Sequence, residues 1–65
     1  MNLRQLAEEY QESAEKLTQR LAQLRRELRT ARGEAALDLQ RRVEVMALEL
    51  ADLRSLSRYL RDYYA

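Results

Sequence analysis

Four glutamates near the start of the chain form the densest group of side chains that could do chemistry. Helical bundles that hold two metal ions use inward-facing glutamates together with a Glu-x-x-His motif, but this chain has no histidine. The glutamates also lie off the apolar positions described below, so we interpret them as a solvated face beside the positive end of a helix dipole. We expect no metal site here. The four residues are Glu8, Glu9, Glu12 and Glu15.

The other residues that could act in catalysis lack the partners that catalysis requires. No serine or threonine has an imidazole to activate it, and Lys16 is the one lysine of the chain. The one glycine, Gly33, cannot build a glycine-rich phosphate loop. The absence of cysteine excludes disulfides and thiolate metal sites. We therefore expect a protein without enzymatic activity and without a cofactor or metal.

Arginine is the most distinctive chemical feature that remains. Arg25, Arg29 and Arg32 share one flank of a helix near Gly33, where they could form a ridge that contacts the phosphates of RNA or DNA. The net charge of the chain is only +1, so the whole molecule exerts no long-range attraction on nucleic acid. Tyrosines that could stack on bases lie near the two ends of the sequence, away from these arginines. Nucleic-acid binding is therefore an alternative hypothesis and not the first one.

The elements that must position these side chains are helices. Strong helix formers (Ala, Leu, Glu, Arg and Gln) dominate the 65 residues, with no proline. The longest uncharged run is far shorter than the ~18 apolar residues that a membrane span requires. The first residues contain no apolar block of the kind found in secretion signals. These features predict an all-α protein that does not associate with a membrane and resides in the cytoplasm.

Apolar residues form two ladders with alternating spacings of four and three, which is the pattern of helices that pack as in coiled coils. The first ladder, extended through Gly33, would reach Asp38 and Arg42 instead of the second ladder. The two are thus out of step by one residue, or about 100° around a helix. The first comprises Leu3, Ala7, Tyr10, Ala14, Leu17, Leu21, Leu24, Leu28 and Ala31, and the second comprises Ala36, Leu39, Val43, Met46, Leu50, Leu53, Ser57, Leu60 and Tyr64.

Gly33 is the predicted turn, because glycine adopts the left-handed conformation that commonly ends a helix. We expect a single domain, residues 1–65, folded as an antiparallel hairpin of helices over 2–31 and 34–63. Asn2 followed by Gln5 predicts a capping box at the start. The central packing residues would be Leu21, Leu24, Leu28, Val43, Met46, Leu50 and Leu53.

A turn centred at Gly33 also predicts which residues face each other. Residues whose numbers add to about 66 should lie at the same level of such a hairpin. Glu8 would then lie near Arg58, and Glu12 near Arg54. Opposite charges would face each other in both pairs, which favours an antiparallel return of the chain.

The second half carries a further apolar row, displaced by roughly 130° from its ladder. The other helix of the hairpin can cover only one of the two faces, and an uncovered apolar strip usually marks an interface. We expect this row to be an oligomer interface, so that a homodimer forms an antiparallel four-helix bundle with the second helices central. A different protein as its partner is the alternative. The row comprises Val45, Leu48, Leu56, Tyr59 and Tyr63 and is interrupted by Asp52.

In architecture alone, this design resembles the Rop family of plasmid copy-number regulators, which are dimeric helical hairpins that bind RNA. The ending formed by Tyr59, Leu60, Tyr63 and Tyr64, after a leucine-laddered first helix, is similar to short uncharacterised helical-hairpin proteins of clostridial type. That resemblance implies a fold but no known activity. The functional prediction is a non-enzymatic, self-associating hairpin that acts through protein contacts, and the alternative is a Rop-like RNA- or DNA-binding regulator that uses the arginines near the turn.

Overall fold

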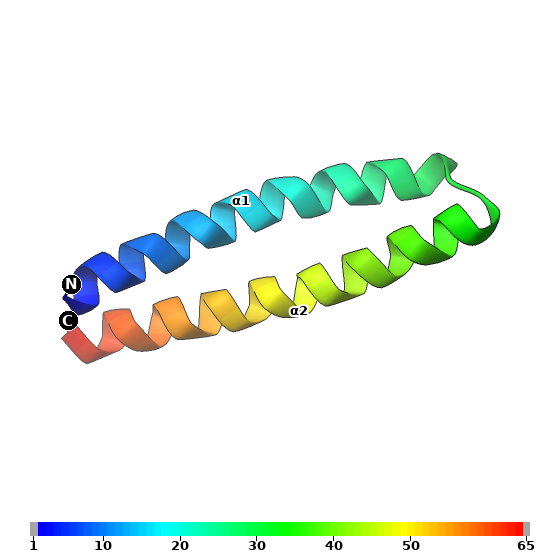
Figure 1. Ribbon diagram of the computed structural model, residues 1–65. Coiled ribbons are helices and arrows are strands. Elements are labelled where there is room, and N and C mark those ends of the chain that lie inside the picture. Colours follow the sequence, from blue (N-terminus) through cyan, green and yellow to red (C-terminus); the bar gives the residue numbers. More distant parts are fainter. Residues whose placement is uncertain (1, 65) are drawn as a thin grey trace.

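Two long antiparallel helices make up the computed structural model, which describes residues 2–64 and the side chains of residues 2–63. Helix α1 spans Leu3–Thr30 and helix α2 spans Gly33–Tyr64. The start of α1 and the end of α2 lie together at one end of the hairpin, opposite the turn (Figure 1). The all-α hairpin expected from the sequence is confirmed, and the helix bounds differ from the predicted 2–31 and 34–63 by one residue at each end.

Helix α1 begins with the predicted capping box. The side chain of Asn2 accepts a hydrogen bond from the backbone N–H of Gln5 at 2.8 Å, and the backbone N–H of Asn2 donates to the side chain of Gln5 at 3.2 Å. These two bonds satisfy backbone groups at the helix start that have no partner within the helix. The apolar contact between Met1 and Leu6 that commonly accompanies such a box lies outside the described residues.

The turn contains the left-handed glycine that was predicted, but this glycine begins α2 and does not end α1. Gly33 has a φ of +63°, the left-handed conformation. The residue that ends α1, however, is Ala31, which is extended (φ −74°, ψ 150°) and whose N–H still donates to the carbonyl of Glu27 at 3.1 Å. The prediction that a left-handed Gly33 ends the first helix is therefore wrong in this detail, because Gly33 is the residue that turns the chain into α2.

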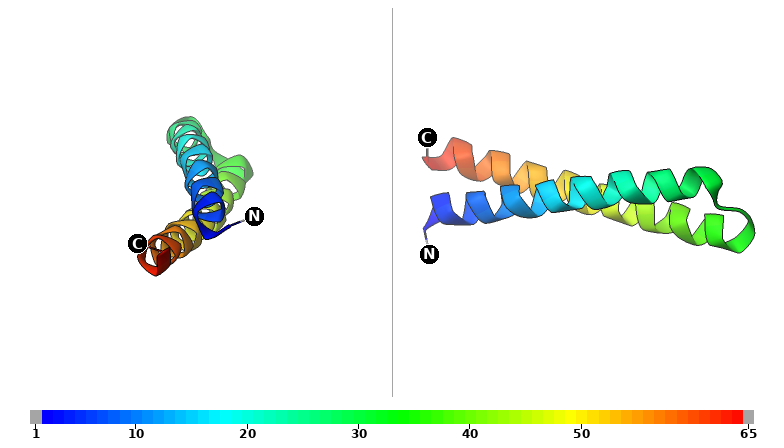
Figure 2. Two further views of the ribbon diagram at one scale, coloured as in Figure 1. Left: turned by 90° about the vertical axis from the view of Figure 1, so that its left-hand side faces the viewer. Right: turned by 90° about the horizontal axis from the view of Figure 1, so that it is seen from above.

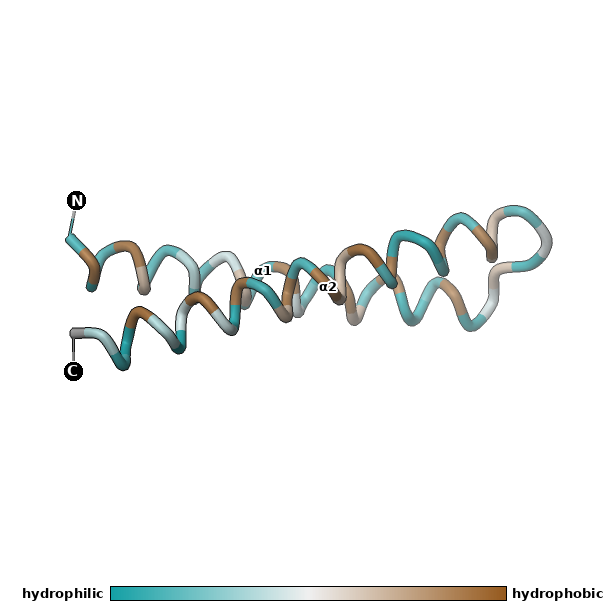
Figure 3. Tube along the Cα trace, turned by 90° about the horizontal axis from the view of Figure 1, so that it is seen from below, coloured by the Kyte–Doolittle hydropathy of each residue, from teal (hydrophilic) through white to brown (hydrophobic). Residues whose placement is uncertain are grey.

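Among the described side chains, the two apolar ladders face each other, as the spacing predicted, except that Leu3 at the open end is exposed. Leu24 is 2% exposed, and Leu21, Leu50 and Ala14 form a buried cluster. Ser57, the one polar member of the ladders, is also buried. The partly buried residues packed against the cluster are Leu17, Val43, Met46, Ala47 and Leu53. Figure 3 shows how apolar positions recur along both helices of the hairpin.

The register between the helices differs from the predicted one. Leu21 and Leu50 share the buried cluster and have numbers that add to 71. Arg54 donates a hydrogen bond to the Thr18 hydroxyl at 3.3 Å, and these numbers add to 72. Glu12 accordingly lies 3.7 Å from Lys16 on its own helix and does not pair with Arg54. The predicted Glu12–Arg54 and Glu8–Arg58 ion pairs are absent among residues 2–63, because α2 is shifted along α1 relative to a turn centred at Gly33.

The hairpin is a slender rod with extents of 47 × 16 × 14 Å. The axes of the two antiparallel helices are inclined to each other, so the helices cross, as the perpendicular views show (Figure 2). A pair of helices can bury only the strip of each helix that faces the other. The remaining faces of both helices are therefore open, and their composition decides what the protein can bind.

Candidate interaction surface

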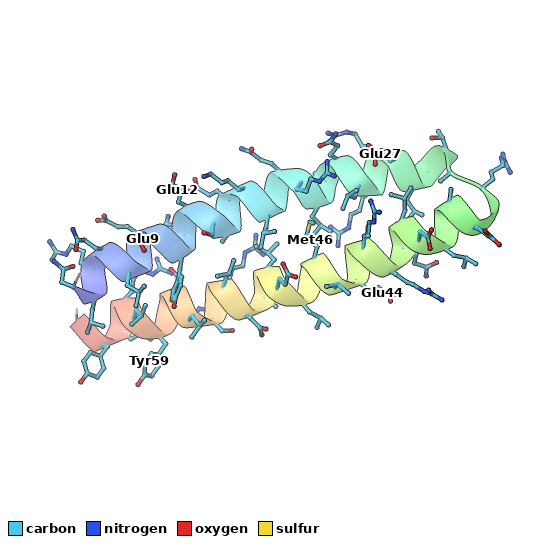
Figure 4. The ribbon with its side chains drawn as sticks, viewed as in Figure 1. Glu9, Glu12, Glu27, Glu44, Met46 and Tyr59 are labelled. Atoms are coloured by element: carbon cyan, nitrogen blue, oxygen red, sulfur yellow. The ribbon has the colours of Figure 1, made fainter. Side chains whose placement is uncertain are left out.

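The further apolar row of α2 lies on the side of the hairpin that no other element covers. All five predicted interface residues, Val45, Leu48, Leu56, Tyr59 and Tyr63, are exposed, with Leu48 at 68% and Tyr63 at 70%. Figure 4 shows the contrast between the two faces of α2, since Met46 points between the helices and Tyr59 points away from α1. The ladder of α2 turns toward α1, and this orientation leaves the row facing solvent.

Leu37 extends this surface toward the turn and was not recognised in the sequence. Its side chain is 58% exposed. Leu37 precedes Val45 by eight residues, which places both on the same side of a helix, but Arg41 stands between them and obscures the pattern. We use the name outer strip for the six large exposed apolar residues of α2, which are Leu37, Val45, Leu48, Leu56, Tyr59 and Tyr63.

The outer strip is large compared with the core beneath it. Among residues 2–63, the fully buried apolar residues are four leucines and two alanines, whereas the outer strip holds six large apolar side chains. An exposed row of large apolar side chains commonly marks an interaction surface. Two of its residues, Tyr59 and Tyr63, also contact each other, with ring centroids 6.3 Å apart.

Two charged residues interrupt the outer strip at regular positions. Arg41 lies between Leu37 and Val45, and Asp52 lies between Leu48 and Leu56. Both side chains are exposed, and neither belongs to an ion pair within the described part of the chain. The outer strip therefore offers one unpaired positive charge and one unpaired negative charge to whatever covers it.

Open grooves run along the two sides of the hairpin, where α1 and α2 meet. One, of about 320 Å³, borders the outer strip and is lined by Val45, Met46 and Leu24 together with Arg42 and Glu49. The other, of about 560 Å³, is more polar and contains Arg54, Arg58 and Arg61 from successive turns of α2. The sequence reasoning missed these three arginines as a group, although their spacing of four and three residues places them on one side of a helix.

The structure locates the alternative nucleic-acid residues at the turn end of the molecule. Arg25, Arg29 and Arg32 are exposed, and no ion pair involves them among the described residues. Arg29 lies in the last turn of α1, where a positive charge complements the helix dipole. Tyr59 and Tyr63 lie near the opposite end, so these arginines and tyrosines do not form one site.

The glutamates considered for metal binding are all exposed on α1. Glu12 points away from α2 (Figure 4). No group of three or more potential metal ligands comes together within residues 2–63. Within the described part of the chain, neither helix combines the length and the apolar character that crossing a membrane requires.

No protein-family model matches this sequence, and neither a curated protein nor a solved structure has significant similarity to it. The resemblances to Rop-type regulators and to clostridial hairpins therefore stay predictions.

Proposed function

We propose that this protein is a non-enzymatic, self-associating helical hairpin that acts through protein contacts, with the outer strip as its contact surface. The observation that carries the proposal is the exposure of six large apolar side chains along one face of α2. Their burial at ~25 cal/mol per Å² would add substantially to the small core of a single hairpin. The assembly would be a four-helix bundle in which the two α2 helices are central.

Sedimentation equilibrium at micromolar concentration tests this proposal. We expect the wild-type chain to sediment above the mass of one 7.7 kDa chain. Leu48→Asp should shift it toward the monomer, because the new carboxylate would have to be buried in the contact. A folded wild-type monomer at these concentrations would contradict the proposal.

Gln23→Asp is the matched control for Leu48→Asp. Gln23 is exposed on α1 and lies at the level of Leu48, since the two numbers add to 71, as in the Leu21 and Leu50 pair. The control introduces the same aspartate into a helix at a site remote from the outer strip. It should leave the sedimentation behaviour unchanged. If both variants reduced self-association equally, the cause would be general destabilisation of the helices and not the loss of the contact.

Nucleic-acid binding is the second candidate, and the exposed, unpaired side chains of Arg25, Arg29 and Arg32 favour it. A mobility-shift titration with double-stranded RNA and DNA at low and high salt tests it, because phosphate contacts weaken steeply as salt rises. Reversal of the three charges to glutamate should abolish a salt-dependent shift while helicity stays intact. Absence of any shift at low salt would dismiss this candidate.

A further inference from the structure

We infer that the partner of the outer strip is a second copy of this chain, bound through an antiparallel contact between the two α2 helices. The two-fold axis of the contact lies on the exposed side of α2, at the level midway between residues 46 and 47. In this arrangement Arg41 of each copy faces Asp52 of the other. This inference rests on the proposed function, because it specifies the occupant and the register of the part of the outer strip from Leu37 to Leu56. The order of apolar and charged residues along the exposed face of α2 supports this arrangement.

The outer strip follows α2 without winding away from one face. Leu37, Leu48 and Tyr59 are spaced by eleven residues, as are Val45 and Leu56. Eleven residues are close to three full turns of an α-helix, so residues with this spacing stay nearly above one another. From Leu37 to Leu56 the strip is about 28 Å long at 1.5 Å per residue. A second helix can therefore lie along it over many turns.

The apolar positions from Leu37 to Leu56 are arranged symmetrically about the midpoint of this segment, and the two charged positions between them are opposite in sign. Leu37, Arg41 and Val45 are separated by steps of four, as are Leu48, Asp52 and Leu56. When a second α2 is laid antiparallel so that facing numbers add to 93, Leu37 faces Leu56, Val45 faces Leu48, and Arg41 faces Asp52. Two-fold symmetry requires a surface that complements itself in this way. Each contact occurs twice in the dimer, so two Arg41–Asp52 pairs form.

The charges distinguish this register from the alternatives that also bring apolar residues together. The same strip can be laid symmetrically on itself about Arg41 or about Asp52, but those centres place two arginines or two aspartates against each other. A parallel pair in register also places like charges together at both positions. Like charges that face each other across a contact destabilise it. Among these four arrangements, the axis between Met46 and Ala47 alone pairs opposite charges.

Charged residues beside the outer strip would also lie near opposite charges in this register. Arg42 and Glu49 line one groove beside Val45, on the same side of the outer strip. Their numbers add to 91, so Arg42 of one copy lies two residues, or about 3 Å along the helix, from the level of Glu49 of the other.

Charge reversal tests the register. Arg41→Asp and Asp52→Arg should each weaken self-association by at least tenfold in Kd, measured by sedimentation, because each places like charges at both symmetric sites. An equimolar mixture of the two variants should recover the wild-type affinity, since every facing pair is then opposite in charge. The double variant Arg41→Asp/Asp52→Arg should recover it alone. Arg26→Asp, an exposed arginine on α1, is the charge-matched control and should not change the Kd.

Disulfide formation tests the orientation, since the natural chain has no cysteine. Oxidation of a mixture of Leu37→Cys and Leu56→Cys proteins should give a cross-linked heterodimer. Leu37→Cys alone should not cross-link, because the two cysteines would lie about 28 Å apart in the antiparallel dimer. Circular dichroism verifies that each variant is still helical.

The outcomes separate this inference from the proposal on which it rests. If the wild-type chain is a monomer, both are wrong. If it self-associates but the mixed charge variants do not recover affinity, or if Leu37→Cys cross-links with itself, self-association stands and this register is wrong. Recovery in the mixture together with the Leu37–Leu56 cross-link supports the antiparallel contact.

Discussion

At the scale of single residues, Gly33 has the most specific role in the fold. Its φ of +63° is costly for any residue with a Cβ, although a Cβ placed there would meet no atom within 4 Å. Gly33→Ala should therefore destabilise the protein by about 1 kcal/mol through backbone conformation alone, which lowers the melting temperature by roughly 4–8 °C. Thermal denaturation at one fixed protein concentration measures this. Gly33→Asn should cost less because Asn tolerates the left-handed region, and an alanine variant as stable as wild type would contradict the reasoning.

Asn2 provides a second residue-scale prediction, at the start of α1. Asn2→Ala removes the acceptor for the Gln5 N–H, a bond of 2.8 Å, and should cost about 1 kcal/mol. Asn2→Asp preserves a capping oxygen and serves as the control. Chemical denaturation at fixed protein concentration should rank the three proteins, with wild type and Asn2→Asp above Asn2→Ala. Equal stability of all three would show that the capping box contributes nothing measurable.

At the scale of the elements, α2 has two apolar faces, one buried against α1 and one exposed. Leu50 packs against α1 and is only 6% exposed, whereas Leu48, two positions earlier, faces solvent. Leu50→Asp buries an unpaired charge and loses the leucine contacts, which together should cost more than ~3 kcal/mol and unfold the hairpin. Leu48→Asp makes the same change in the same helix and should reduce association while retaining more helicity. Circular dichroism compares the two, and unchanged melting of Leu50→Asp would contradict the assigned core.

At the scale of the whole molecule, the thin rod of two helices has only a small core, so the proposed self-association would contribute to its stability. Self-association of this kind would stabilise the folded state by mass action, so the melting temperature should rise with protein concentration. We expect a rise of about 5 °C for each tenfold increase, since a factor of ten in concentration corresponds to ~1.4 kcal/mol. Calorimetry between about 10 and 1000 µM measures it. A melting temperature independent of concentration would indicate a hairpin that is stable as a monomer.

The sequence by itself determined the helices, the turn and the two faces of α2. Helix formers, the Asn2–Gln5 pair and the lone glycine are local signals, and local signals act through the backbone of neighbouring residues. The ladders also identified which side of each helix is buried, because apolar spacing determines the face of a helix directly. For this reason the exposed residues from Val45 to Tyr63 could be predicted individually, while Leu37 was missed behind Arg41.

Only the tertiary structure decided the register of α1 against α2 and whether the left-handed glycine ends the first helix or begins the second. A ladder with spacings of three and four is nearly unchanged when one helix slides along the other by a turn, so the sequence pattern is compatible with several offsets. The geometry of the connection, with Ala31 extended and Gly33 left-handed, selects one of them. It places Leu21 with Leu50 and Thr18 with Arg54, and it leaves Glu12 to pair along its own helix with Lys16.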